Sequence, residues 1–175
     1  YLGVRHIVGI QKWDSYAKAR YIAQLIEQGL SVKEVERQIG DKRGSATLNY
    51  VGYKILEQVE QELGIDTRHA QQDFSLLLLA MGQAKLKRFL GLPRRLADAN
   101  ITEPIAVENL ENLRRLISWI FGANGELRVI TDSRDITRYL SHIAESTEAT
   151  DYLNRTRDIL GAYERTDGEE QMVLK

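Results

Sequence analysis

The residues best suited to contact another molecule gather between positions 42 and 49 of this 175-residue chain. Lysine and arginine neutralise phosphates, arginine also pairs with a guanine edge, and asparagine can read adenine through two hydrogen bonds. Serine and threonine hydroxyls add further contacts to bases or phosphates. The run therefore predicts a contact with duplex DNA, with a solvated helix start as the alternative, through Lys42, Arg43, Ser45, Thr47 and Asn49.

Further positive charges are candidates for contacts to a DNA backbone, because clustered cations release counterions from phosphates. The densest stretch has five positive charges and no acid between Gln83 and Leu96. A solvated face is the alternative, and the formal net charge of −1 offers no global attraction to nucleic acid. The candidate phosphate contacts are Lys33, Lys85, Lys87, Arg88, Arg94 and Arg95.

The DNA-contact residues begin the last helix of a pattern typical of a helix-turn-helix. Ser31 and Glu34 form a capping box for a short helix. That helix ends at Gly40, a residue that accepts the positive φ of a sharp turn. Apolar residues at helical spacing then continue over about 42–63. A short helix, a sharp turn and a second helix in this order predict a DNA-binding region over residues 16–66.

The rest of the chain also has helical spacing. Apolar residues recur at three and four positions over about 73–90, 107–122, 132–143 and 147–163, and 127–130 alone looks extended. We therefore expect an all-α fold, a helix-turn-helix followed by a bundle-like helical region with at most one short extended segment. The expected parts are the end of a preceding domain or linker over 1–15, the helix-turn-helix region over 16–66, a helical domain over 67–166 and an acidic flexible tail over 167–175.

One face of the third predicted helix conflicts with a simple DNA-reading role. If Ala46 and Tyr50 face the core, helical periodicity turns another apolar set away from it, namely Leu48, Val51 and Ile55. Proteins usually reserve an exposed apolar patch of this kind for a partner. We expect this face to be covered, either by the helices after Val107 or by a second subunit.

The stretch from Ala19 to Gly40, with Gly29-Leu30-Ser31-Val32-Lys33-Glu34-Val35 inside it, resembles the start of the DNA-binding region of ParB partition proteins and their plasmid relatives. Upstream, the residues from Arg5 to Trp13 are similar to a junction in a divergent ParB-like group, where they follow a nucleotide-binding or sulfiredoxin-like domain. Shorter pieces similar to that group are Phe89–Pro93, Asp132–Asp135 and Ala162–Glu164.

The resemblance implies that this chain is the carboxy-terminal part of a bacterial ParB-like protein of plasmid-partition or phage-defence type, which binds DNA as a dimer. Several ParB-like proteins use CTP as a switch, and the loops that hold it would precede Tyr1. The resemblance therefore implies CTP as a cofactor of a longer protein and no cofactor for this segment. Arg5 stands roughly where a phosphate-contacting arginine would, without the family's surrounding residues.

Other chemistries lack their residues. The chain has no cysteine, and its histidines, at positions 6, 69 and 142, have no partner at metal-ligand spacing, so we expect no metal site. Asp132 and Asp135 suit helix capping, and no residue is assigned to catalysis. No apolar run approaches the roughly 20 residues of a membrane span.

We expect a cytoplasmic, non-enzymatic DNA-binding segment that forms a homodimer or binds a partner protein. The alternative is a protein-interaction module of a plasmid-maintenance or phage-defence system, whereas a nuclease component has no residues to support it.

Overall fold

A computed structural model describes residues 14–41 and 44–174, with side chains placed up to Thr166. Within these ranges the chain forms helices and no strand, which confirms the predicted all-α fold. The elements are α2 (Ser15–Glu27), α3 (Val32–Ile39), α4 (Ser45–Leu63), α5 (Arg68–Gln72), α6 (Phe74–Met81), α7 (Ala84–Phe89), the 3₁₀ turns η1 (Leu96–Asp98) and η2 (Val107–Asn109), α8 (Leu110–Phe121), the π-helical turn η3 (Ile136–Leu140), α9 (Ser141–Ile143), α10 (Thr147–Thr156) and α11 (Ile159–Leu174).

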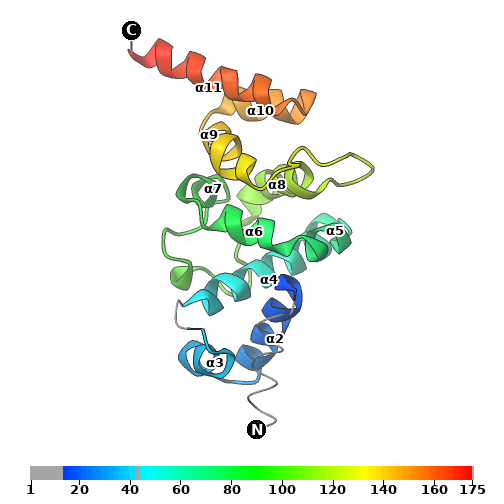
Figure 1. The fold of residues 1–175 in the computed structure, drawn as a ribbon, viewed down its shortest axis with the longest axis vertical. Coiled ribbons are helices and arrows are strands. Elements are labelled where there is room, and N and C mark those ends of the chain that lie inside the picture. The colour runs from blue at the N-terminus through cyan, green and yellow to red at the C-terminus, as the bar shows by residue number, and fades with distance from the viewer. Residues whose placement is uncertain (1–13, 42–43, 175) are drawn as a thin grey trace.

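The helices form an elongated stack (Figure 1). The helices α2 and α3 lie at one end, α4 crosses the stack next to them, α6 and α8 follow, and α10 and α11 lie at the opposite end. Thus α4 lies between α2 and α3 on one side and the later helices on the other, and it contacts both groups.

Local capping sets the boundaries of the first helices. The Asp14 side chain accepts from the amide of Ala17 at 2.9 Å and begins α2. The predicted capping box at α3 is present: the Ser31 hydroxyl accepts from the Glu34 amide at 3.2 Å, and the Glu34 carboxylate accepts from the Ser31 amide at 3.3 Å. Gly40 ends α3 with a φ of 71°, the left-handed conformation that the sequence predicts there.

The apolar interior crosses the boundary predicted between residues 66 and 67. A small cluster joins α2, α3 and the start of α4 around Ile22, Val35 and Tyr50. A second, much larger cluster is contiguous in space and draws its buried residues from positions between Ala19 and Ala162. The larger cluster includes residues of α4 and of every longer helix after it, so packing unites the two predicted regions.

The apolar face of α4 that the sequence turns outward is covered from within the chain. Val51 and Ile55 are at most 1% exposed, and Leu48 packs against the larger cluster. The covering helices are α6 and α8. At Gly52 the approach is so close that an added Cβ would lie 3.0 Å from Phe74 on α6. The predicted coverage is thus confirmed, although α6 precedes Val107, where the sequence analysis placed the covering helices.

Two long helices of the sequence prediction are each divided in the structure. The pattern over 73–90 forms α6 and α7, because the chain turns at Gly82 and becomes extended at Gln83, with ψ at 122°. Glycine is a poor helix former, and the turn leaves Leu86 and Leu90 buried after the chain changes direction. The pattern over 147–163 forms α10 and α11, and α11 continues to Leu174, where the sequence predicts a flexible tail.

The segment over 127–130 is not a strand. The amides of Val129 and Ile130 both donate to the carbonyl oxygen of Trp119, at 2.8 and 3.0 Å, which docks this loop on the end of α8. In Figure 1 the loop between α8 and α9 extends sideways from the stack.

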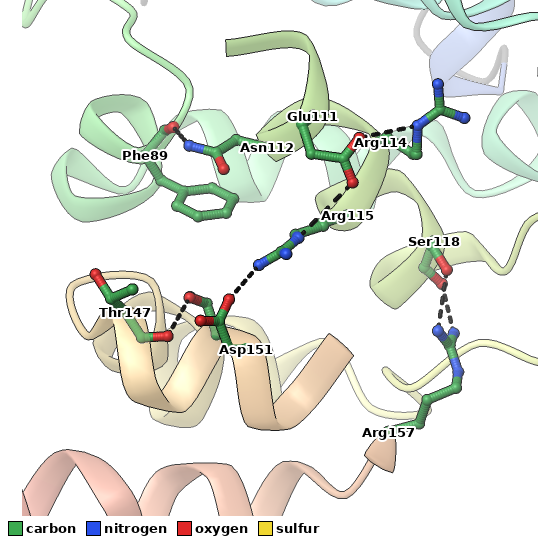
Figure 2. A network of polar contacts seen from close by, with 10 residues as sticks. Phe89, Glu111, Asn112, Arg114, Arg115, Ser118, Thr147, Asp151 and Arg157 are labelled. Atoms are coloured by element: carbon green, nitrogen blue, oxygen red, sulfur yellow. Dashed lines mark hydrogen bonds and ion pairs between the residues drawn. The ribbon is translucent and has the colours of Figure 1, made fainter. Parts of the chain in front are cut away.

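Arg157 joins the break between α10 and α11 to the end of α8 (Figure 2). Its guanidinium donates to the hydroxyl and carbonyl oxygens of Ser118, both at 3.0 Å, and to the carbonyl oxygen of Leu127 at 2.6 Å. It also forms a 2.9 Å ion pair with Glu126. Arg157 ends α10 with a φ of 59°, an unusual conformation for a residue with a side chain. No local pattern of residues indicates these contacts of Arg157, because its partners stand 30 to 39 positions earlier in the chain.

We predict that Val51→Glu destabilises the chain without changing its oligomeric mass. An unpaired charge in the core costs several kcal/mol, so the free energy of unfolding should fall by about 3 kcal/mol or more in chemical denaturation. Val107→Glu is the matched control, because Val107 is 76% exposed. A Val51→Glu variant with wild-type stability and a lower sedimented mass would show that a second subunit covers this face.

A pair of substitutions at Arg157 should separate its side-chain bonds from its backbone conformation. Arg157→Gly removes the bonds and relieves the left-handed backbone, whereas Arg157→Ala removes the bonds and keeps the strain. We expect both variants to lose about 1–3 kcal/mol of unfolding free energy, with Ala about 1 kcal/mol less stable than Gly. Denaturant melts of the two variants measure this difference, and equal stability of Arg157→Ala and wild type would mean that these side-chain bonds contribute nothing.

Candidate nucleic-acid interface

The helix-turn-helix of the sequence prediction is present as α3, a turn through Gly40 and Gly44, and α4. Asp41 follows the left-handed Gly40, and its amide donates to the carbonyl oxygen of Glu36 at 2.9 Å. Gly44 is also left-handed, with a φ of 70°, and directs the chain into α4. The small apolar cluster holds α3 against α2 and against the start of α4. These contacts fix the angle between α3 and α4.

The predicted base-contacting residues have different fates. Lys42 and Arg43 lie outside the described residues. Thr47 is half-buried. The amide of Ser45 donates to the Asp41 carboxylate at 2.9 Å and its hydroxyl donates to the same oxygen, so Ser45 takes part in the cap of α4. Ser45 and Thr47 therefore remain at the accessible start of α4, with Ser45 already bonded within the chain.

Asn49 is not positioned to read a base, which corrects the sequence prediction. Its side chain is 3% exposed, and its amide nitrogen donates to the carbonyl oxygen of Ser45 at 2.9 Å. The Asn49 carbonyl oxygen is buried without a hydrogen-bond partner in the described part of the chain. The spacing contained a signal for this position, because Asn49 stands three residues after the core residue Ala46 and shares its face.

Most of α4 before its last turn is also covered by other helices. From Ser45 to Val59 every residue is buried or half-buried, because α2 and α3 pack on one side and α6 and α8 on the other. A recognition helix that lies along a major groove needs a free face over several turns. No such face runs along α4 up to Val59, and its exposed last turn carries Glu60 and Glu62, so a DNA contact at the start of this helix is end-on.

The described cations beside this turn come from α3. Lys33 and Arg37 are exposed on α3, one helical turn apart. They line a shallow depression of about 610 Å³ together with Glu36, Gly40 and Asp41. The surface formed by Lys33, Arg37, Gly40, Gly44 and Ser45 is called the helix-turn-helix tip below. Arg37 was missed in the sequence analysis, although its four-residue spacing from Lys33 places both on one face.

The basic stretch after Gln83 does not form one free surface. Glu145 pairs with Lys85 at 3.5 Å and with Arg88 at 2.7 Å. The hydrogen bond from Arg88, with the positive charge of Lys85, lowers the pKa of Glu145. Lys87 donates from Nζ to the carbonyl oxygen of Arg94 at 2.8 Å. Three of the five candidate phosphate contacts are thus engaged within the chain.

Arg94 and Arg95 differ from those three. Both are exposed and neither forms an ion pair with a residue that the structure describes. They precede η1, which contacts α4. In Figure 1 this short green turn lies near the amino end of α4. Arg94 and Arg95 therefore lie on the side of the stack that carries the helix-turn-helix tip.

Carboxylates and histidines give no sign of a catalytic or metal centre in the described ranges. No group of three or more potential metal ligands gathers there, and His6 lies outside them. Hydrogen bonds from the Arg134 side chain and amide hold the pKa of Asp132 at about 2. Among the same residues no helix has the length and apolar character that crossing a membrane requires.

Comparison with protein families, with curated proteins and with solved structures finds no match to this chain.

Proposed function

We propose that this chain binds duplex DNA through the helix-turn-helix tip. The observation that carries the proposal is the α3–turn–α4 geometry, in which two left-handed glycines and a compact apolar cluster present the amino end of a 19-residue helix. The amino end of a helix favours anions, because its dipole is positive there, and the Asp41 carboxylate already accepts from the first amide of α4, that of Ser45. Lys42 and Arg43 directly precede this end in the sequence and add two positive charges.

The burial of α4 defines the kind of binding that we propose. A tip that approaches end-on reaches phosphates and at most the base edges beside the first turn of the helix. Phosphate contacts fix position and carry no sequence information, so binding is dominated by the backbone and depends strongly on salt. Arg94 and Arg95 supplement the tip, because they lie on the same side of the stack.

The wider biological role is part of this proposal and rests on the resemblance of the stretch from Ala19 to Gly40 to ParB-like proteins. In that role the chain is a non-enzymatic DNA-binding part of a cytoplasmic plasmid-partition or phage-defence protein. It acts as a homodimer, and CTP binds to a part of the protein that precedes it.

A protein-interaction module is the second candidate function, and exposed apolar side chains favour it. Leu127 is 86% exposed in the loop that extends sideways from the stack, and Leu160 is 56% exposed on α11. A contiguous patch of exposed apolar side chains marks a contact for a protein partner, and these two leucines are the candidates for one. Under this alternative the helices bind another protein, and α4 serves as a structural support.

We predict that replacing both Lys42 and Arg43 with alanine weakens duplex binding and flattens its salt dependence. If each side chain contacts one phosphate, the slope of log affinity against log salt should decrease by roughly two units. Fluorescence anisotropy with a labelled duplex at several salt concentrations measures both quantities.

The matched control removes two charges far from the tip, with Arg134 and Arg138 both changed to alanine. These residues lie in the half of the stack that carries α8 to α11, so the control should keep the wild-type slope. If the Lys42 and Arg43 double variant binds the duplex like wild type, the start of α4 is not the DNA contact. If wild type binds no duplex, the interaction-module alternative takes its place.

A further inference from the structure

A polar groove lies on the other half of the stack, away from the helix-turn-helix tip. It has a volume of about 720 Å³ and is open to solvent, and α7, the start of α8 and the junction of α9 with α10 form its walls. This volume is in the range of small-molecule sites. The DNA proposal assigns no role to this groove.

Three cations converge on the groove from two helices. Lys85 and Arg88 come from α7 and Arg115 comes from α8. The carboxylates that line it, Glu145 and Asp151, come from the opposite wall. The lining therefore has three positive and two negative side chains, a net positive charge within a concave surface. Field lines in such a concavity concentrate, which attracts a small anion.

The carboxylates hold the cations in place without saturating them. Arg115 uses one terminal nitrogen for Asp151, at 2.9 Å, and Figure 2 shows its guanidinium extending from α8 towards α10. The Nε of Arg115 is buried and makes no hydrogen bond in the described part of the chain, with its nearest carboxylate oxygen, on Glu111, 3.8 Å away. A guanidinium has five donors in a planar fork, so Arg115 keeps donors for a further acceptor.

The carboxylates of Glu145 and Asp151 can also be displaced from the cations by a ligand. The side chains of Glu145 and Asp151 are 44% and 54% exposed, so each can turn into water when a stronger acceptor arrives. Exposed ion pairs of this kind contribute little to stability, which makes their replacement inexpensive. A phosphate offers several acceptor oxygens and more charge than one carboxylate, and arginine matches its geometry with two parallel hydrogen bonds.

Neutral groups complete the wall beside the cations. Asn112 donates to the carbonyl oxygen of Phe89 at 2.8 Å, which fixes its side chain and leaves its own oxygen free of that bond. The ring of Phe89 stacks on Trp119, with centroids 5.9 Å apart, and is therefore held rigidly at the groove. In Figure 2 Phe89 and Asn112 lie on one side of Arg115, and Thr147 lies across from them.

We propose that this groove binds a small phosphate-bearing anion, held by Arg115 and Arg88 in place of their carboxylate partners. A DNA backbone carries the same phosphate chemistry, but a duplex is convex, whereas a concave groove crossed by three ion pairs suits a compact ligand. The site is independent of the helix-turn-helix tip, so a variant of the tip should leave it unchanged.

Calorimetric titration of the full chain with sodium pyrophosphate at constant ionic strength tests the proposal. We expect saturable binding with one site, weakened at least tenfold by Arg115→Gln. Arg88→Gln, on a residue that is 64% exposed and not needed for the core, should also weaken it. Asp151→Asn removes the competing carboxylate and should strengthen binding, whereas Glu103→Gln, an equal charge change outside the groove, should not.

Non-saturable heats, or affinities that the arginine variants leave unchanged, would overturn the proposal. Duplex DNA distinguishes the source of the phosphate: if Arg115→Gln weakens duplex binding and pyrophosphate does not bind, the groove is a backbone contact and the small-ligand proposal is wrong. The Lys42 and Arg43 double variant should bind pyrophosphate as wild type does. Loss of its duplex binding alone would leave the groove proposal standing, and loss of pyrophosphate binding in the arginine variants alone would leave the DNA proposal standing.

Discussion

The packing of α4 between α2 and α3 on one side and α6 and α8 on the other is the constraint on which the rest of the structure depends. This helix supplies apolar residues to both clusters, with Ala46 and Tyr50 in the small one and Val51, Ile55 and Val59 in the large one. Its buried polar residues bond both within the helix and far along the chain, as Asn49 and Gln58 show. Gln58 pairs in both directions with the backbone of Ile105, at 2.7 and 2.9 Å, and so holds the loop before η2 against the helix. Because α4 packs into both clusters, it positions both ends of the stack relative to each other.

This commitment decides what α4 can do. In a helix-turn-helix that reads sequence, the second helix is stabilised from one side and leaves the other for the groove. Here the second side is used by α6 and α8, and Gly52 allows Phe74 to approach the helix axis closely. Lys54 is also bonded within α4. Its 2.7 Å hydrogen bond to Glu57 raises the pKa of Lys54 and favours the charged form of this largely covered ammonium group. The contacts that we propose therefore lie at the first turn of α4, on exposed loops and in the groove between α7, α8 and α10.

The features that the sequence predicts well are local ones. The capping box at Ser31 and the turn at Gly40 follow from residue types at short spacing, and helical periodicity identifies the apolar face that α6 covers. Asn49 was assigned to DNA because its chemistry fits a base, although its position beside Ala46 already indicated burial. The contacts of Arg157 and the ion pairs of Glu145 join residues 30 to 60 positions apart. Only the three-dimensional path of the chain brings them together. That path depends on the break at Gly82, and the spacing of apolar residues over 73–90 fits a continuous helix as well as a broken one.

Native-state hydrogen exchange tests most directly whether α4 unites the two ends of the stack. The account predicts that amides of α4 between Asn49 and Val59 share one opening free energy with those of α6 and α8, equal within about 1 kcal/mol to the global free energy of unfolding. Such a result means that the helix-turn-helix end and the remaining helices open together through their common helix. Exchange of α2, α3 and α4 through a lower-energy opening that leaves α6 and α8 protected would contradict the account, because the helix-turn-helix would then be a separate unit with its second helix free to engage a groove.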